Sequence, residues 1–228
     1  MINILNKIVS TIKGESFTID PGVPFSYLIS LSISKSLMLI RGFFTFCRSD
    51  GLFFRGRNTV IRAKGLMKLG RSVSIDRNCY IDALSSEGII LGNNVSIGKF
   101  TTIECSGSIK NIGVGLKVGN NVGLGTHGFF GCAGGVEIGS NTIFGNFVSI
   151  HSENHKCQDL NTPIRLQGIE RMGIKIGEDC WIGAKVTILD GACIEDGSVI
   201  AAGSVVIKGI YEGNKIYGGV PARLLKSR

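Results

Sequence analysis

Apolar residues recur at every sixth position over long stretches of this chain. Starting at Ile176, the next positions at this spacing are Ile182, Ile188, Ile194, Ile200 and Val206. Shorter runs with the same spacing are Leu69, Ile75, Ile81; Leu91, Ile97, Ile103, Ile109; Val118, Leu124, Phe130; and Ile138, Phe144, Ile150. This period matches neither the turn of an α-helix nor the simple alternation of a half-buried strand. It is typical of a short strand followed by a bend, repeated many times.

Glycine and asparagine occupy fixed places within the six-residue unit. Glycine fills 33 of 228 positions, which is about twice its usual share of ~7%, and it often directly follows the apolar residue. Asn94, Asn121 and Asn141 each come three residues after an apolar position. Both residue types suit tight corners, because glycine lacks a side chain and asparagine tolerates left-handed backbone. The pattern predicts stacked coils around a buried ladder of branched side chains, and it disfavours a glycine-rich β-sandwich.

The repeats resemble those of the hexapeptide-repeat transferases over roughly residues 58–228. The resemblance implies an all-β fold, a left-handed parallel β-helix with three hexads in each coil, which is an exception to the right-handed rule for parallel crossovers. We expect residues 58–207 to form this β-helix, and residues 208–228 to form a short tail that contributes to a coenzyme A site. Residues 1–57 should form an apolar and basic N-terminal segment, with a helix over residues 25–46. The family also implies a homotrimer with active sites in the grooves between neighbouring β-helices.

The longest interruption of the repeat covers residues 151–175. A loop of this length within so regular a scaffold is usually functional or disordered. Residues 152–155 (SENH), followed by residues 162–165 (TPIR), resemble the protruding loop of the sugar O-acetyltransferase branch, which includes galactoside, maltose and polysaccharide acetyltransferases. That resemblance implies that His155 is the general base, and we expect His151, Glu153 and Arg165 to contact the substrate.

The expected chemistry explains why a histidine is needed in the loop. A sugar hydroxyl is a poor nucleophile, and a neutral imidazole can accept its proton while the oxygen attacks a thioester carbonyl. The second ring nitrogen needs a partner that fixes the tautomer, and Glu153, Asp159, Glu137 or a backbone carbonyl remain open for this role. Cys157 offers a rival mechanism through an acyl-enzyme, whereas members of the family transfer the acyl group directly.

Three further segments match the family closely and concern the acyl donor. They are residues 176–184 (IGEDCWIGA), residues 200–206 (IAAGSVV) and residues 218–223 (GGVPAR). The resemblance implies that acetyl-CoA is bound by Trp181, Ala184, Ala202, Lys208 and Arg223. In this assignment the small residues leave room for the pantetheine arm and the cations meet the phosphates. Residues 209–213 replace the commoner proline-containing turn, which leaves the placement of the tail open.

The N-terminal segment has a different character. Residues 25–46 are apolar enough for a helix that nominally spans a bilayer, but Lys35 and five serines interrupt them. Ser26, Ser30 and Ser34 share one helical face, although residues 31–37 also alternate as a strand would. Seven of the twelve phenylalanines lie in the first 54 residues, and residues 41–77 carry nine basic against two acidic side chains. This composition suits peripheral contact with an anionic membrane, and the alternative is that the segment packs on the β-helix.

The overall composition excludes several classes of protein. With only four prolines and 43% hydrophobic residues, the chain is neither collagen-like nor disordered. Seven scattered cysteines without a Cys-x-x-Cys pair predict neither a disulfide scaffold nor a zinc knuckle, and they suit the cytoplasm. The first twenty residues lack the apolar core and cleavage site of a secretory signal. The basic residues, despite a net charge of +8, follow no nucleic-acid-binding motif, so we expect no nucleic acid partner.

The resemblance implies an acetyl-CoA-dependent O-acetyltransferase, and we expect it to need no metal. Its expected acceptor is a sugar hydroxyl in a surface polysaccharide (O-antigen, capsule or exopolysaccharide) or in a lipid-linked glycan precursor, modified in the cytoplasm or at the inner face of the cell membrane. One alternative is N-acylation of a nucleotide-linked amino sugar. Another is a zinc-dependent β-helix enzyme that uses His127, His151 and His155, although His127 is expected to be a packed polar side chain. The last is a non-catalytic scaffold.

Overall fold

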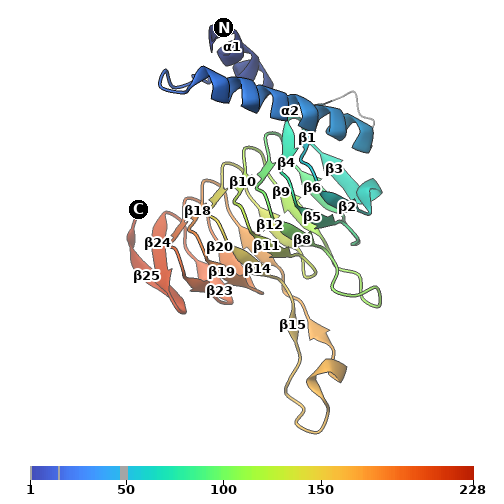
Figure 1. Ribbon diagram of the computed structural model, residues 1–228. Helices are drawn as coiled ribbons and strands as arrows, with labels where there is room; N and C mark the ends of the chain where they lie inside the picture. Colours follow the sequence, from blue (N-terminus) through green and yellow to red (C-terminus); the bar gives the residue numbers. More distant parts are fainter. Residues whose placement is uncertain (1, 15, 47–50) are drawn as a thin grey trace.

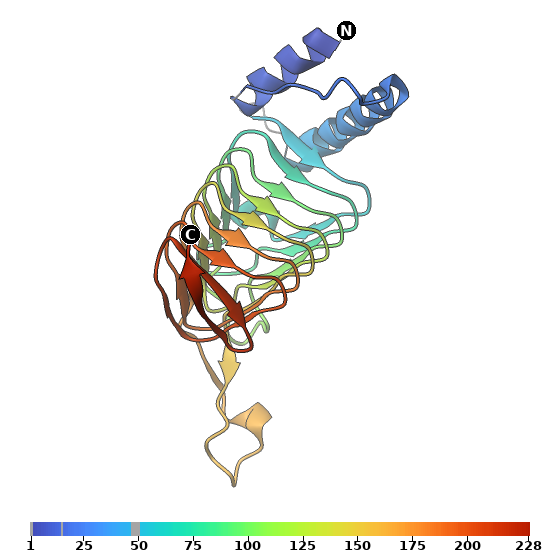
Figure 2. The same cartoon turned by 90° about the vertical axis from the view of Figure 1, so that its left-hand side faces the viewer.

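The computed structural model describes residues 2–14, 16–46 and 51–228, and its main body is a stack of triangular coils (Figures 1 and 2). Three parallel sheets form the sides of the stack, and the chain visits them in turn. The predicted left-handed parallel β-helix is confirmed. We call the sheets A, B and C, and we name each corner by the two sheets that it joins.

Each sheet takes one strand from every coil. Sheet A contains β1 (Phe53–Arg55), β4 (Val73–Ile75), β7 (Ser96–Ile97), β10 (Gly123–Leu124), β13 (Ile143–Phe144), β18 (Trp181–Ile182), β21 (Val199–Ile200), β24 (Lys215–Gly219) and β25 (Ala222–Ser227). Sheet B contains β2 (Val60–Arg62), β5 (Tyr80–Asp82), β8 (Thr102–Glu104), β11 (Phe129–Gly131), β14 (Ser149–His151), β19 (Thr187–Leu189) and β22 (Val205–Val206). Sheet C contains β3 (Met67–Leu69), β6 (Ile89–Leu91), β9 (Leu116–Val118), β12 (Val136–Ile138), β17 (Ile174–Ile176), β20 (Ala192–Ile194) and β23 (Gly209–Tyr211). We number the seven coils that contribute a strand to all three sheets 1 to 7 in this order, and β24 and β25 of sheet A follow coil 7.

The predicted six-residue ladder forms the core. Ile182 and Ile200 are direct neighbours in sheet A, and Ile188 lies next to Val206 in sheet B. All four side chains are completely buried. Burial of such a branched side chain contributes about 1.5–3 kcal/mol, so stacking identical positions makes each coil stabilise the next.

Glycine and asparagine shape the corner between sheets C and A. A Cβ on Gly139 would lie 2.5 Å from the carbonyl carbon of Gly177 in the next coil, so only glycine allows the coils to approach. Asn94, Asn121 and Asn141 have φ angles of 57°, 57° and 60°. Their side chains form a ladder in which the Asn94 amide donates to Asn121 at 2.9 Å and the Asn121 amide donates to Asn141 at 3.1 Å. The predicted left-handed corner is therefore present.

One repeat position was assigned wrongly from the sequence. Ile109 continues the six-residue spacing, but it lies in a loop between β8 and β9 and is 87% exposed. The inward positions of this coil are instead Leu116 and Val118, which pair with β6 and β12. The inserted loop shifts the register, so the spacing at Ile109 is a coincidence.

The N-terminal helices lie together at the coil 1 end of the stack (Figures 1 and 2). They are α1 (Ile2–Lys13) and α2 (Phe25–Phe46), so the helix expected at residues 25–46 is present. The buried residues of α2 are Leu28, Met38, Gly42 and Thr45, and a Cβ on Gly42 would lie 1.8 Å from the Phe53 carbonyl oxygen. One face of α2 therefore packs tightly on β1, while a short 3₁₀ turn (Lys64–Leu66) follows β2.

The β-helix begins at Phe53, five residues before the expected boundary at residue 58. Arg55 lies in register with the inward Ile75 of coil 2. Its guanidinium donates to the Thr45 hydroxyl at 3.1 Å and to the Thr59 carbonyl at 2.6 Å. Because a cation that closes the end of the stack replaces the inward isoleucine, the sequence pattern is lost in this coil.

The C-terminal tail also belongs to the β-helix beyond the expected end at residue 207. Tyr211 and Tyr217 take the places below Ile194 and Ile200, and both rings are buried. Aromatic residues thus replace the aliphatic ladder, which hides the last coil from a search for Ile, Leu and Val. The final strand, β25, turns back antiparallel along β24.

Candidate active site

A hairpin leaves the β-helix at the B–C corner of coil 5 and extends well away from the body (Figures 1 and 2). It begins after His151 at the end of β14 and returns at Ile174 in β17. Its stem is the antiparallel pair β15 (Asn154–His155) and β16 (Ile169–Glu170), and a 3₁₀ turn (Ile164–Leu166) lies between them. The interruption expected at residues 151–175 is therefore an ordered arm, which we call the arm.

Two buried polar side chains fix the points where the arm leaves and rejoins the body. Ser152 is buried, its hydroxyl donates to the Gly131 carbonyl at 2.8 Å and it accepts from the Gly134 N–H at 2.9 Å. The carboxylate of Asp190, also buried, accepts the backbone N–H groups of Met172 at 3.0 Å and Gly173 at 2.8 Å. A buried carboxylate is tolerated here because N–H donors satisfy it.

Arg171 braces the base of the arm against coil 3. Its guanidinium contacts the Glu153 carboxylate at 2.7 Å through Nε and through Nη2. The same group donates to the carbonyls of Ile112 at 3.0 Å and Asn111 at 3.1 Å, in the loop between β8 and β9. Both side chains are largely covered, with 20% and 24% exposure. The arm and this loop are thus joined at one corner.

His155 lies on β15 and is exposed. The three acids considered as its orienting partner have other contacts. Glu153 pairs with Arg171, and Glu137 lies 3.8 Å from Lys117. Hydrogen bonds from the Thr162 hydroxyl and the Asn161 N–H lower the pKa of Asp159. Within the described part of the chain, none of them is hydrogen-bonded to the His155 ring.

His151 ends β14, on the last strand before the arm as expected. Its Nε2 lies 2.6 Å from the Ser149 hydroxyl, and its ring is 5.3 Å from the Phe129 ring. His151 is exposed overall. Part of its ring is nevertheless covered by the protein, and the resulting loss of contact with water lowers the pKa of His151. Arg165 lies far along the arm in the 3₁₀ turn and is exposed, so it does not join His151.

Ala184 and Ala202 lie on top of each other at the A–B corner of coils 6 and 7. The Gly203 N–H donates to the Ala184 carbonyl at 2.9 Å. A Cβ on Gly183 would lie 2.6 Å from the Ala202 nitrogen, whereas a Cβ on Gly203 would meet nothing within 4 Å. The backbone of this corner is therefore open to a ligand, which fits the small-residue role that the resemblance implies.

An aromatic ladder continues the same A–B corner upward through coils 3 to 5, and it was not singled out from the sequence. The ring of His127 lies between those of Phe100, at 4.8 Å and 25°, and Phe147, at 4.7 Å and 23°. All three residues are exposed and have φ angles near 60°, where aromatic residues are rare. Each follows an inward residue by three positions, as the corner asparagines do, so the spacing rule could have found them. His127 is stacked, as a packed side chain would be, but it is not buried.

The other expected donor contacts lie on different sides of the last coils. Trp181 is 55% exposed on the outer face of sheet A, between Ile143 and Val199. Arg223 is exposed on β25 of the same sheet. Lys208 follows β22 at the B–C corner, where its side chain packs beside Gly191. Trp181 and Arg223 thus share a sheet with one another, while Lys208 lies across the full width of sheet B.

The candidate site is incomplete within one chain. The arm with His155 leaves from the B–C corner, whereas Ala184 and Ala202 lie at the A–B corner, on the opposite edge of sheet B. The arm also points away from the body rather than across that sheet (Figure 1). His155 and the corner at Ala184 and Ala202 therefore do not form one site within a single chain.

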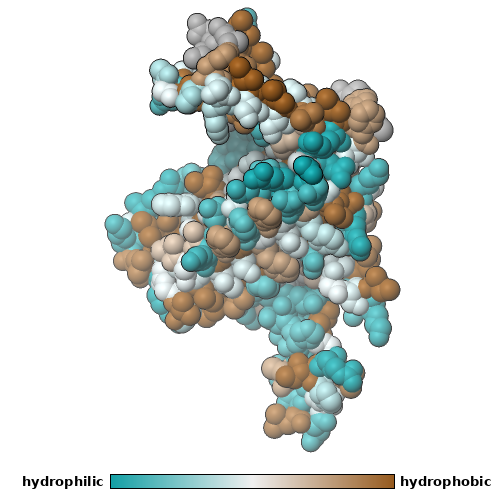
Figure 3. All heavy atoms as spheres, in the orientation of Figure 1, coloured by the Kyte–Doolittle hydropathy of each residue, from teal (hydrophilic) through white to brown (hydrophobic). Residues whose placement is uncertain are grey.

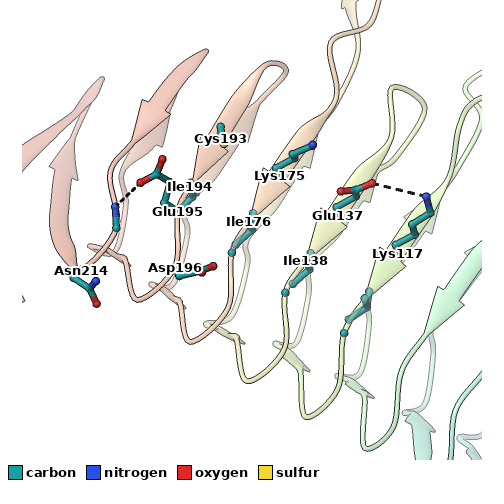
Figure 4. A pocket seen from close by; sticks show the side chains of 15 residues that line it. Lys117, Glu137, Ile138, Lys175, Ile176, Cys193, Ile194, Glu195, Asp196 and Asn214 are labelled. Atoms are coloured by element: carbon teal, nitrogen blue, oxygen red, sulfur yellow. Dashed lines mark hydrogen bonds and ion pairs between the residues drawn. The ribbon is translucent and has the colours of Figure 1, made fainter.

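A charged groove lies elsewhere, on the outer face of sheet C (Figure 4). It has a volume of about 790 Å³ and is lined by charged side chains that include Lys117, Glu137, Lys175 and Glu195. Lys117 also pairs with Glu87 at 2.6 Å, which raises the pKa of Lys117. None of the residues expected to bind substrate or donor lines this groove, so it is not the candidate active site.

The described residues contain no group of three or more His, Cys, Asp and Glu side chains that could hold a metal ion. His127, His151 and His155 lie on a corner, a strand end and the arm, respectively. A three-histidine zinc site within one chain is therefore excluded for the described residues. Cys157 is exposed on the arm and carries a free thiol.

Comparison with known proteins agrees with the fold and the repeat. Residues 173–208 match the family model described as bacterial transferase hexapeptide (six repeats). The chain thus carries the hexapeptide repeat over these residues and folds as a β-helix, and its predicted resemblance to the hexapeptide-repeat acyltransferases is confirmed. It is 32% identical over 178 residues to a probable acetyltransferase of Mycobacterium tuberculosis. That alignment covers 78% of this chain and 55% of the relative, so the chain spans about half the length of the curated relative that it matches.

Solved structures of AntD, an N-acyltransferase from Bacillus cereus, have a similar fold. Its D94N mutant in complex with dTDP and coenzyme A aligns with a TM-score of 0.56 and 19% identity, covering 76% of this chain and 85% of that chain. The complex of AntD with dTDP and 3-hydroxybutyryl-CoA aligns with a TM-score of 0.53 and 16% identity, covering 79% of this chain and 81% of that chain. At these identities the likeness establishes the fold alone.

Proposed function

We propose that the protein is an acetyltransferase that transfers an acetyl group from acetyl-CoA to a sugar hydroxyl, with His155 as general base. The observation that carries this proposal is the braced arm, which holds an exposed histidine away from the body while the small-residue corner at Ala184 and Ala202 remains open. The similarity to a probable acetyltransferase supports the acetyl group. A non-catalytic scaffold would need neither the anchors of the arm nor the open corner.

The reaction that we propose is direct transfer. The neutral His155 imidazole accepts the proton of the acceptor hydroxyl as that oxygen attacks the thioester carbonyl. The tetrahedral intermediate then collapses, the carbon–sulfur bond breaks, and the imidazolium returns the proton to the coenzyme A thiolate. Backbone N–H groups stabilise the oxyanion of such intermediates. The products are an acetyl ester and coenzyme A, and the base is regenerated.

The donor site that we propose follows the A–B corner. The exposed backbone at Ala184 and Ala202 contacts the pantetheine arm, and Trp181 flanks it from sheet A. Lys208 and Arg223, both exposed cations, meet the phosphates of the nucleotide end. Because His155 and this corner lie on opposite edges of sheet B, the working enzyme is an oligomer, and the homotrimer implied by the family supplies His155 from one protomer to the donor corner of the next.

The acceptor is best supported as a sugar. The exposed Phe100–His127–Phe147 ladder lies directly above the donor corner, and aromatic rings contact the apolar C–H faces of ring-shaped ligands. His151, Glu153 and Arg165 remain candidates for contact with its hydroxyls. We place the acceptor in a surface polysaccharide or its lipid-linked precursor, modified in the cytoplasm. An amino sugar that gives an amide is the second candidate, because AntD with its similar fold is an N-acyltransferase.

The test is incubation of the purified protein with labelled acetyl-CoA and glycan fractions from the source cell. We expect a labelled product whose acetyl group mild base removes, because esters are labile and amides are not. His155→Ala should abolish turnover while the oligomer remains folded. A base-stable product would replace the hydroxyl acceptor with an amine, and an active His155→Ala variant would overturn the assignment of the base.

A further inference from the structure

The solvent-facing side of α2 is apolar. Opposite the face that packs on β1, an exposed stripe runs along the helix at positions spaced by four, four, three and four residues. Its members are Ile29, Ile33, Leu37, Ile40 and Phe44, with exposures of 46%, 56%, 45%, 54% and 74%. A helix of a soluble protein normally turns such a stripe toward the core. Here the protein body covers the other face, so the stripe is left for a partner outside this chain.

No charged side chain interrupts the stripe. Lys35 is on the flank near the body, where its ammonium lies 5.5 Å from the centre of the Phe54 ring. Arg41 is only partly exposed. Figure 3 shows the hydrophobic residues gathered along α2 at the upper end of the molecule. The neighbouring helix α1 adds exposed Ile4 and Ile8, with Lys7 between them, at the same end of the stack.

The charge of the protein is concentrated at this end. Residues 1–81 contain twelve Lys and Arg against four Asp and Glu, whereas residues 82–228 contain thirteen of each. The whole net charge of +8 therefore belongs to residues 1–81, which comprise the helices, coil 1 and the first part of coil 2. Four basic residues of coil 1 are exposed, namely Arg57, Arg62, Lys64 and Lys68. An apolar stripe beside a basic collar is complementary to a surface that offers acyl chains below negative headgroups.

We propose that the stripe on α2, with the basic collar of coil 1, docks the protein on the surface of an anionic lipid bilayer. The helix lies in the plane of the interface and inserts Ile33, Ile40 and Phe44 among the headgroups. This proposal does not depend on the acetyl transfer proposed above, because it concerns binding to lipid.

The packing of α2 favours the peripheral mode over a spanning one. By length and composition, α2 is the one helix in the described ranges that could cross a membrane. However, Leu28, Met38 and Gly42 are buried in the folded protein, and the Gly42 backbone directly contacts the carbonyl of Phe53 in β1. Pulling α2 into the bilayer would uncover these residues and the end of the core. A helix in the interface keeps both of its faces covered.

The test is co-sedimentation of the full-length protein with vesicles. We expect strong binding to vesicles that contain phosphatidylglycerol, weak binding to pure phosphatidylcholine, and release by high salt or alkaline carbonate. The double variant Ile33→Glu/Ile40→Glu should weaken binding at least tenfold, because it places two charges in the stripe. Ile109→Glu is the matched control, since Ile109 is fully exposed in the loop between β8 and β9, and it should bind as the wild type does. Arg57→Gln/Lys68→Gln should weaken binding several-fold and reduce its dependence on salt.

Folding of the variants is checked by circular dichroism and thermal unfolding. As a second probe, Ile40→Trp keeps the stripe apolar, and its fluorescence should shift to the blue on addition of phosphatidylglycerol vesicles only. Equal vesicle binding by the wild type and the Glu double variant would overturn the proposal. The proposal would also be overturned if the wild type did not bind vesicles and the double variant lost its oligomeric state. The stripe would then bind a second copy of the chain. Resistance to carbonate extraction would overturn the peripheral mode.

Discussion

Removing the guanidinium of Arg171 should slow the reaction without unfolding the protein. Arg171 joins the base of the arm to the loop between β8 and β9 through the carbonyls of Ile112 and Asn111, and it pairs with Glu153 across the base of the arm. In Arg171→Ala the arm keeps its anchors at Ser152 and Asp190, so it remains attached. What it loses is the contact that fixes its direction relative to coil 3.

The size of the effect follows from these contacts. Each hydrogen bond to a partly exposed carbonyl contributes about 1 kcal/mol. The ion pair with Glu153 adds less than a buried pair would, because solvent screens side chains that retain a fifth to a quarter of their exposure. Together they bias the arm by about 2 kcal/mol, which corresponds to a roughly thirtyfold change in the population of the productive orientation.

The assay is steady-state kinetics with acetyl-CoA and an acceptor that the wild type accepts. We expect kcat to fall about thirtyfold while the KM for acetyl-CoA stays within about twofold, because the donor residues lie on coils 6 and 7. Arg171→Lys should recover part of the rate, since an ammonium can pair with Glu153 but cannot fork to both carbonyls. Lys110→Ala, an exposed change in the same loop, is the control. Wild-type kcat in Arg171→Ala, or a rise in KM for acetyl-CoA alone, would refute the reasoning.

Three further outcomes are expected. Ile182→Ala should lower the free energy of unfolding by about 2–5 kcal/mol, because Ile182 is completely buried. Ile109→Ala, at an exposed position, should change it by less than about 0.5 kcal/mol. Denaturant titration of both variants measures the difference. Burial lowers the pKa of His151 from its ordinary value of 6.5, so the folded state disfavours the protonated ring. The free energy of unfolding should therefore be highest above pH 6.5 and should decrease as the pH drops below that value. In His151→Gln this decrease should be smaller. Cys157→Ala should keep activity, because direct transfer needs no thiol, and an inactive but folded variant would restore the acyl-enzyme mechanism.

The sequence predicted those parts of the fold in which each coil repeats the last. Ile176 and its successors are spaced regularly because each inward side chain must stack on the one below, and Asn94 and its successors recur because each corner needs the same left-handed backbone. The first and last coils of the stack could not be predicted in this way. Arg55 and Tyr211 lie at the two ends of the stack, where their side chains break the apolar pattern. Their inward positions follow from the pairing with neighbouring coils, which the sequence alone does not reveal.

The candidate site was predictable to a smaller extent. His155 and its loop could be found because a long interruption stands out against a regular repeat. The brace could not, because Arg171 and Asn111 are sixty residues apart in sequence and neither belongs to a motif. Glu153 was expected to serve substrate or His155, yet within this chain it pairs with Arg171. The aromatic ladder at Phe100 and Phe147 obeyed the corner rule, but that rule was applied to asparagine alone.

The two proposals together make a prediction that neither makes alone. Adjacent coils are about 4.8 Å apart, so coil 5, where the arm leaves, lies about 19 Å along the stack from coil 1 and its basic collar. If α2 rests on the bilayer, the site is held at a fixed height above the headgroups, where it meets a lipid-linked glycan. Ile33→Glu/Ile40→Glu should therefore slow acetylation of a vesicle-bound acceptor about tenfold or more and leave acetylation of a soluble glycan unchanged. Equal loss on both acceptors would mean that α2 supports the catalytic body itself, since a docking surface affects only substrates confined to the membrane.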